Sequence, residues 1–174
     1  MKLTNTLPAF ELKGTDERMH STHDYAQKTA IVVLFTCNHC PYARAYIKRI
    51  AELTEAYEPL NVGFFAINSN DAVRYPEDAF GNMIAMGKQL NLHGKYLHDE
   101  SQEVARLFEA KRTPEVFLFD EQKTLVYQGA IDNNWEVAAA ASQHYLKAAL
   151  QAVLAGNRPD PTETPAIGCS IKWK

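Results

Sequence analysis

The sequence predicts an α/β protein with a central mixed β-sheet flanked by helices. Three observations support this fold class. Two runs of apolar residues, 30–35 and 62–68, have the length and composition of buried strands. Between them, residues 41–57 carry apolar side chains every three or four positions, which is typical of an amphipathic helix. Residues 116–120 and 124–129 form two further apolar runs across a short polar turn. We therefore expect right-handed parallel crossovers first and an antiparallel pair afterwards.

The first elements follow from local patterns, taken in chain order. Residues 7–14 alternate between apolar and polar and end at a glycine, so they predict a short edge strand. Residues 15–28 are polar and without a strong period, which favours a loop or a short hairpin. The helix that begins at Pro41 is expected to stop before Pro59.

The second half of the chain is justified in the same way. A helix is expected over 76–90, because acidic side chains occupy its first turn. Residues 95–99 predict a short strand, and residues 101–108 predict a short helix that a serine caps. The alanine- and leucine-rich segment 136–155 predicts the final helix. The tail, residues 157–174, contains three prolines and is expected to be extended.

Length and composition limit the classes of protein to consider. The 174 residues fit one domain over 1–174, and 46% hydrophobic content is ordinary for a globular protein. A net charge of -3 and the lack of a basic run predict no binding to nucleic acid or to an anionic membrane surface. The N-terminus lacks the apolar core of a secretory signal, and no run reaches the length of a membrane span. A cytoplasmic location is therefore expected, and the oligomeric state is left open.

Two cysteines lie where the first buried strand gives way to the helix. Cys37 and Cys40 follow the strand at 30–35, and Pro41 stands where the first position of a helix favours proline. The unpaired N–H groups and positive potential of a helix N-terminus favour thiolate over thiol, and the thiolate is the species that attacks disulfides. The spacing therefore predicts a redox-active dithiol. We expect Cys37 to attack from an exposed helix start and Cys40, one turn further on, to resolve the mixed disulfide.

Three other interpretations concern the same region. A structural zinc site normally needs four ligands, and the chain has neither a second C-x-x-C pair nor a well-placed histidine pair, so no metal and no cofactor is expected. His39 either stabilises a neighbouring thiolate or is an exposed helix residue without a role. Cys169 is either an ordinary thiol or a third reactive thiol, which would require the tail to fold back onto the dithiol and exchange with it or shield it.

Thr113 and Pro114 form a further candidate feature. A proline directly before a buried strand removes one donor from the hydrogen-bond ladder. If the peptide bond before Pro114 is cis, the backbone of Thr113 would be presented to an incoming peptide.

Together these features resemble the thioredoxin superfamily. The C-x-x-C-Pro helix start, the later Thr-Pro before a strand-turn-strand, and the terminal helix carry the resemblance. The segment 68–99 adds a helix between the second core strand and the Thr-Pro motif. That insertion is similar to the alkyl hydroperoxide reductase/thiol-specific antioxidant branch, which includes thioredoxin-like reductases and peroxiredoxins. The resemblance implies a thioredoxin-like fold, a nucleophilic Cys37, a resolving Cys40 and a cis Pro114.

Three stretches resemble an uncharacterised bacterial thioredoxin-like subfamily more closely. They are FTCNHCPY at 35–42, AINSND at 66–71 and TPAIGCSIKW at 164–173. Two departures from better-known relatives matter. Thr36 stands where thioredoxins usually carry tryptophan, so the substrate surface differs. Peroxiredoxins carry Thr-x-x-Cys with the peroxidatic cysteine at the position of Cys40, and here Cys37 replaces that threonine, while Val33 replaces the upstream proline.

The leading functional hypothesis is therefore a thiol-disulfide oxidoreductase. Its substrate would be a protein or low-molecular-weight thiol or disulfide, and its reductant is unidentified. A peroxiredoxin-like thiol peroxidase is the alternative enzyme. A non-enzymatic metal carrier or redox sensor is the third hypothesis, although copper-delivery proteins of this fold separate their cysteines by three residues and here the separation is two.

Overall fold

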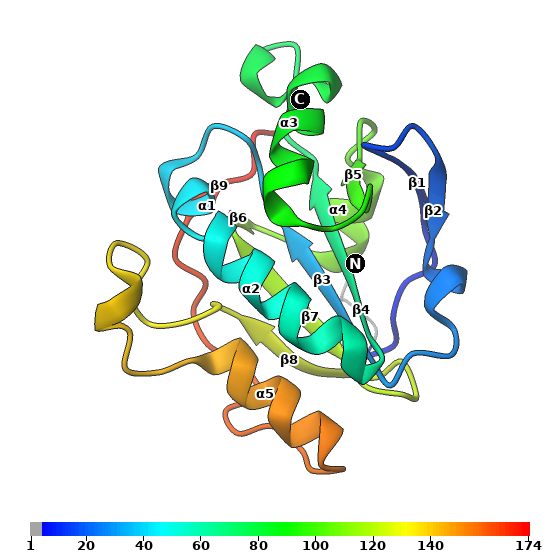
Figure 1. Ribbon diagram of the computed structural model, residues 1–174. Helices are drawn as coiled ribbons and strands as arrows, with labels where there is room; N and C mark the ends of the chain where they lie inside the picture. The colour runs from blue at the N-terminus through cyan, green and yellow to red at the C-terminus, as the bar shows by residue number, and fades with distance from the viewer. Residues whose placement is uncertain (1–4) are drawn as a thin grey trace.

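The computed structural model describes residues 5–174 as a layered α/β structure around a seven-stranded sheet (Figure 1). The strands lie in the order β2-β1-β5-β4-β3-β7-β8, and a separate two-stranded sheet joins β6 and β9. The bounds of the strands are Glu11–Gly14 (β1), Met19–Ser21 (β2), Ala30–Phe35 (β3), Val62–Asn68 (β4), Tyr96–His98 (β5), Arg112–Thr113 (β6), Glu115–Phe119 (β7), Leu125–Gly129 (β8) and Cys169–Ser170 (β9).

The centre of the sheet is the strand that leads to the dithiol. Every residue of β3 is buried, as a strand with helices on both faces requires. β3 pairs parallel with β4 and antiparallel with β7, while β7 pairs antiparallel with β8. The mixed sheet and the order of its core strands confirm the predicted fold class.

Helices cover both faces of the sheet. α2, α3 and α5 pack on one face and α4 packs on the other, because alternate residues of β3 and β4 point to two separate apolar clusters. α3 is the predicted extra helix between β4 and the Thr-Pro motif. The bounds of the helices are Pro41–Ala45 (α1), Ile47–Tyr57 (α2), Phe80–Leu90 (α3), Glu103–Phe108 (α4) and Tyr145–Leu154 (α5).

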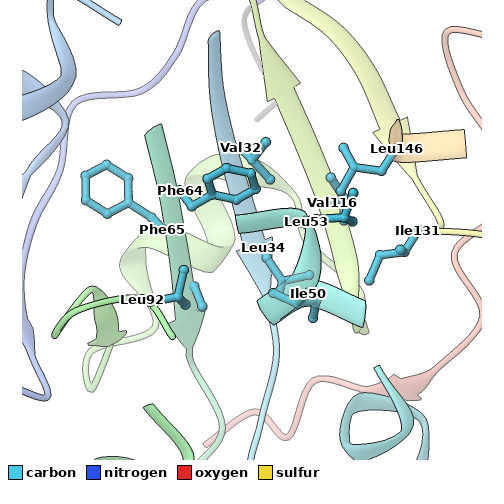
Figure 2. Close-up of a pocket in the computed structure, with 11 residues that line it drawn as sticks. Val32, Leu34, Ile50, Leu53, Phe64, Phe65, Leu92, Val116, Ile131 and Leu146 are labelled. Atoms are coloured by element: carbon cyan, nitrogen blue, oxygen red, sulfur yellow. The ribbon is translucent and has the colours of Figure 1, made fainter. Parts of the chain in front are cut away.

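Figure 2 shows a small cavity on the face that α2 covers. Val32 and Leu34 of β3, together with Ile50 and Leu53 of α2, contribute to its wall. All the residues that line it are aliphatic or aromatic, and no cysteine is among them. The cavity therefore belongs to the core rather than to the dithiol.

The first predicted helix is divided in two. Tyr46 separates α1 from α2, and its N–H bonds to the Ala43 carbonyl at 3.2 Å in a tightened turn. The Tyr46 hydroxyl donates to Asp132 at 2.6 Å, and the Arg49 guanidinium lies over the Tyr46 ring. The hydrogen bond to Asp132 is a long-range contact that accompanies the break, and a periodicity of apolar residues does not reveal it.

Two predicted helix starts were wrong. Pro76–Asp78 forms a 3-10 turn and α3 begins at Phe80. The Asp78 side chain is buried inside the protein, so it does not take part in the first turn of the helix. The final helix begins at Tyr145 rather than 136. Residues 138–140 are exposed and have no apolar face to pack, so their high helix propensity does not suffice.

Three further segments differ in detail from the sequence prediction. β1 does not lie at the edge, because β2, within the segment predicted as loop or hairpin, pairs with it. α4 begins at Glu103, two residues after the expected serine cap; the Asp99 carboxylate accepts the N–H groups of Val104 and Ala105. The tail is largely extended, and β9 lies within it. Among residues 5–174, no helix has both the length and the apolar character needed to cross a membrane.

Candidate active site

The dithiol lies between the end of β3 and the start of α1. Cys40 is the N-cap residue of α1, and Pro41 occupies the first helical position, as predicted. Both cysteines have 0% exposure. The expectation of an exposed Cys37 at the helix start was therefore wrong: Cys37 precedes the helix, and Cys40 is the residue that meets its N–H groups.

Thr113 borders both sulfur atoms. Its hydroxyl lies 3.5 Å from Cys37 Sγ, and its carbonyl oxygen lies 3.5 Å from Cys40 Sγ. The peptide bond between Thr113 and Pro114 is cis, which confirms that prediction. Glu115 holds the preceding turn, since its carboxylate accepts the N–H groups of Lys111 and Arg112 at 2.7 and 3.2 Å. Burial raises the pKa of Glu115.

The two thiols have opposite electrostatic environments. The hydrogen bond from the Cys37 thiol holds the pKa of Cys40 well below its usual range, against the cost of burial, and the Cys169 thiol and the N–H groups of Ala43 and Cys169 add to this effect. Donating that bond, together with burial, raises the pKa of Cys37. These opposite pKa shifts favour a Cys40 thiolate beside a Cys37 thiol, the reverse of the roles expected from the sequence. Forming that thiolate gives up the hydrogen bond that the protonated Cys40 thiol donates to the Thr113 carbonyl oxygen.

This asymmetry predicts the pH dependence of the thiolate signal. Because the folded-state pKa of Cys40 is lowered, its thiolate is expected to persist as the pH falls below about 8.5, where an ordinary cysteine becomes protonated. Thiolate absorbance in the ultraviolet, followed from alkaline to acid pH, should show a step well below that value in the reduced wild type. Cys40→Ser should lose the step and Cys169→Ser should retain it. An acid-side step that remains in Cys40→Ser would contradict the assignment.

Asp78 organises the segment between the cysteines. Its side chain is fully buried and accepts hydrogen bonds from the Asn38 backbone N–H (2.7 Å) and from the side-chain amides of Asn68 (3.1 Å) and Asn70 (3.0 Å). His39 Nδ1 is a further partner of this carboxylate. A carboxylate only accepts, so Nδ1 carries the proton in this pair. The conformation of residues 38 and 39 is thereby tied to the end of β4.

Aromatic side chains complete this arrangement. The Tyr96 hydroxyl donates to the Asn38 amide oxygen at 2.7 Å, and the Asn38 amide N–H donates to the Glu77 carbonyl at 2.9 Å. The His39 ring stacks on Tyr75 with 5.5 Å between ring centroids. His39 is thus a positioned residue of the site, and its principal partner is Asp78.

One cluster in this region has donor atoms suited to a metal ion. Cys37 Sγ, a ring nitrogen of His39 and a carboxylate oxygen of Asp78 all lie within 4.8 Å of one another. The Asp78 carboxylate already accepts from Asn38, His39 and the two asparagine amides. A cation would have to displace some of these donors, so the arrangement is satisfied as a hydrogen-bonded network.

The tail does fold back onto the dithiol. β9 pairs antiparallel with β6, with Cys169 opposite Thr113, and Cys169 packs against the cluster of Cys37, Cys40 and Ala43. Cys169 remains partly exposed while the other two cysteines are buried. The structure therefore brings together the candidate site residues named from the sequence: Cys37, His39, Cys40, Pro41, Thr113, Pro114 and Cys169.

Sequence reasoning missed the carboxylate that organises the site. Asp78 was assigned to the first turn of a helix, and nothing at its position indicated burial. The available signal was indirect: Asn68 ends a strand made entirely of buried residues, and Asn70 and Asp78 add further buried polar side chains in the segment that follows it. Polar groups at the carboxyl end of a parallel strand are candidates for a site.

Comparisons with known proteins show the family of the chain. The sequence profile of the Redoxin family matches residues 2–144. The chain belongs to the Redoxin family. Membership supports a thiol redox function for this redoxin, with Cys37 and Cys40 as its two neighbouring thiols. No functionally curated protein matches it.

Two solved structures are similar to this redoxin over nearly its whole length. An uncharacterized conserved protein from Geobacillus kaustophilus has 37% identity and a TM-score of 0.92, covering 99% of this chain and 93% of its own. A hypothetical protein from Sinorhizobium meliloti 1021 has 31% identity and a TM-score of 0.92, covering 100% and 96%. A putative thiol:disulfide interchange protein, DsbE, from Chlorobium tepidum shares the fold, with 19% identity, a TM-score of 0.61, and coverage of 74% and 84%.

Proposed function

We propose that this redoxin is a thiol-disulfide oxidoreductase in which Cys37 and Cys40 alternate between dithiol and disulfide. The observation that carries the proposal is the pairing of the two sulfurs at the start of α1, with the cis Thr113–Pro114 peptide beside both of them. The Cys40 thiolate attacks one sulfur of a substrate disulfide and forms a mixed disulfide, and the other sulfur leaves as a thiolate. Cys37 then loses its proton and attacks Cys40, which releases the reduced substrate and closes the Cys37–Cys40 disulfide.

Both sulfurs are buried, so a substrate disulfide reaches them only when the residues that cover them move. We propose a protein or low-molecular-weight disulfide as substrate, a separate thiol reductant that regenerates the dithiol, and a cytoplasmic location for the protein. No bound cofactor takes part in the proposed reaction, because the electrons are carried by the two cysteines.

A redox titration tests the proposal. Reduced wild-type protein equilibrated with mixtures of reduced and oxidised glutathione should show one reversible two-electron couple, with the Cys37–Cys40 disulfide identified by peptide mapping after acid quenching. The stabilised Cys40 thiolate favours the reduced state, so the couple should be more oxidising than the thioredoxin value of about -270 mV. The absence of any reversible disulfide between these two cysteines would refute the proposal.

A thiol peroxidase is the second candidate. It is favoured by one observation, the buried thiolate position of Cys40 at a helix N-terminus, which corresponds to the peroxidatic position of peroxiredoxins. Against it stands Cys37, which replaces the usual threonine. Peroxide consumption by the same reduced protein separates the candidates: the oxidoreductase proposal expects a rate close to that of free cysteine, and much faster consumption would favour the peroxidase.

A further inference from the structure

The backbone edge of Thr113 is already occupied by the chain itself. The sequence suggested that a cis Pro114 would present this edge to an incoming peptide. In the structure, β9 lies along it in antiparallel register, with Cys169 opposite Thr113 and Ser170 opposite Arg112. The tail therefore occupies the place that an extended peptide would take beside the dithiol (Figure 1).

The approach of the tail at this point is unusually close. A Cβ atom on Gly168 would lie 2.3 Å from the Thr113 carbonyl oxygen and 3.2 Å from the Pro114 nitrogen. Both neighbouring atoms belong to the backbone, so they cannot move aside as a flexible side chain would. A glycine is required at 168 to let the tail reach Thr113.

The residues after β9 hydrogen-bond to two other segments of the chain and so hold the tail in place. The Ile171 N–H donates to the Lys111 carbonyl at 3.1 Å, and the Ile171 side chain is buried in the core cluster on the α4 face. The Lys172 N–H donates to the amide oxygen of Asn70 at 2.9 Å, and Asn70 also holds Asp78. The tail is thus built into the hydrogen-bond network that shapes the dithiol.

The docked segment carries a thiol of its own against the dithiol. Cys169 packs on Cys37 and Cys40, and both its thiol and its N–H interact with Cys40. A substrate peptide engaged in exchange would have to present a cysteine to the same sulfur. Cys169 therefore has the position of a substrate cysteine, within the same chain.

We propose that residues 168–170 are an internal substrate segment, docked on Thr113, whose Cys169 forms a second disulfide with Cys40. This inference rests on the proposed oxidoreductase function. Starting from the Cys37–Cys40 disulfide, the Cys169 thiolate attacks Cys40 Sγ. The Cys40–Cys169 bond forms, the Cys37–Cys40 bond breaks, and Cys37 leaves as a thiolate that takes up the proton Cys169 gave up. The number of electrons is unchanged, so no further oxidant is required.

The exchange uncouples Cys37 from Cys40 and stores the oxidising equivalents at the partly exposed Cys169. It also links the tail covalently to the start of α1. In the Cys40–Cys169 state an external peptide is excluded from Thr113, whereas Cys37 is returned to the thiol form.

The Cys37→Ser variant tests this directly. The probe is oxidised glutathione, which should first form a mixed disulfide at Cys40 and release one molecule of reduced glutathione. Cys169 then attacks Cys40 and displaces the second molecule of reduced glutathione, which leaves one Cys40–Cys169 disulfide. Peptide mapping after acid quenching should find this disulfide within single protein chains. A persistent glutathione adduct on Cys40, or two unreacted thiols, would overturn the proposal. Acid-quenched, partly oxidised wild type gives a second measurement: both disulfides should be present, and Cys37–Cys40 alone would count against it.

Gly168→Ala in the Cys37→Ser background separates docking of the tail from chance encounters between Cys169 and Cys40. The added methyl group should push β9 away from Thr113 and lower the yield of the Cys40–Cys169 disulfide severalfold. Gly81→Ala is the matched control, because a Cβ at Gly81 meets no atom within 4 Å, and it should leave the yield unchanged. Equal yields in the two variants would show that docking of the tail is not what brings Cys169 to Cys40.

The outcomes distinguish this proposal from the one it rests on. If the wild type shows a reversible Cys37–Cys40 couple and Cys37→Ser forms no Cys40–Cys169 bond, the oxidoreductase function stands and the internal substrate is refuted. If Cys40–Cys169 forms but no Cys37–Cys40 couple exists, the proposed function fails, and the tail disulfide is a separate property of the chain.

Discussion

The Cys40→Ser variant is expected to lose its attack on disulfides by more than about a thousandfold, whereas Cys37→Ser is expected to keep a rapid first attack. The reason is the placement of Cys40 at the N-cap of α1, where it accepts hydrogen bonds from Cys37 and from N–H groups, while Cys37 is a donor with a raised pKa. A serine hydroxyl at position 40 stays protonated and cannot replace the thiolate.

The measurement uses a small aromatic disulfide that releases a coloured thiolate. At about pH 5, where ordinary thiols are almost fully protonated, wild type and Cys37→Ser should give a burst of release that Cys40→Ser lacks. Cys169→Ser serves as the matched control for loss of a thiol elsewhere in the cluster. If Cys37→Ser loses the burst and Cys40→Ser retains it, the order of attack is the one expected from the sequence, and the assignment from the structure is wrong.

Replacing Asp78 by asparagine is expected to lower the free energy of unfolding by about 2–4 kcal/mol. The carboxylate is fully buried and serves the Asn38 N–H, His39 and two asparagine amides at once. An asparagine side chain supplies one acceptor oxygen and one NH₂ group. At least one buried donor would therefore face another donor.

Urea unfolding of the reduced protein measures this change. Glu77→Gln is the matched control, since it removes the neighbouring acidic charge from an exposed side chain, and its effect should stay within about 0.5 kcal/mol. The same loss of hydrogen bonds should loosen residues 38 and 39, so Cys37 and Cys40 should be alkylated faster in Asp78→Asn than in Glu77→Gln. Equal stabilities of the two variants would show that Asp78 does not organise the site.

Much of the framework could be predicted from the sequence because burial alone determines it. The residues of β3 and β4 are apolar throughout, and such runs have few alternatives to a strand covered on both faces. The dithiol was predictable for a similar reason, since its spacing and Pro41 are local signals. The start of α5 was missed because the alanines at 138–140 carry a helix propensity that no packing partner supports.

The roles within the site could not be predicted, because they depend on contacts between distant segments. Which of the two cysteines is the N-cap residue depends on the residue at which α1 begins after β3. A shift of that start by three residues would exchange Cys40 for Cys37 at the N-cap. The burial of Asp78 requires the turn after β4 to fold inward and meet Asn38. Cys169 is more than 50 residues from Thr113 in the chain, and only the pairing of β6 with β9 brings it to the dithiol.

One tryptophan contacts the helix that follows the dithiol and the other lies in the tail, so the protein carries two intrinsic fluorescent probes. Trp135 lies 4.2 Å, between ring centroids, from Tyr42, which packs against the cysteine cluster. Trp173 lies in the tail beneath the Arg106 guanidinium. The chain contains only these two tryptophans. Fluorescence from Trp135 therefore reports on the helix side of the dithiol and fluorescence from Trp173 on the tail, so single Trp→Phe variants allow changes at each place to be followed without an attached dye.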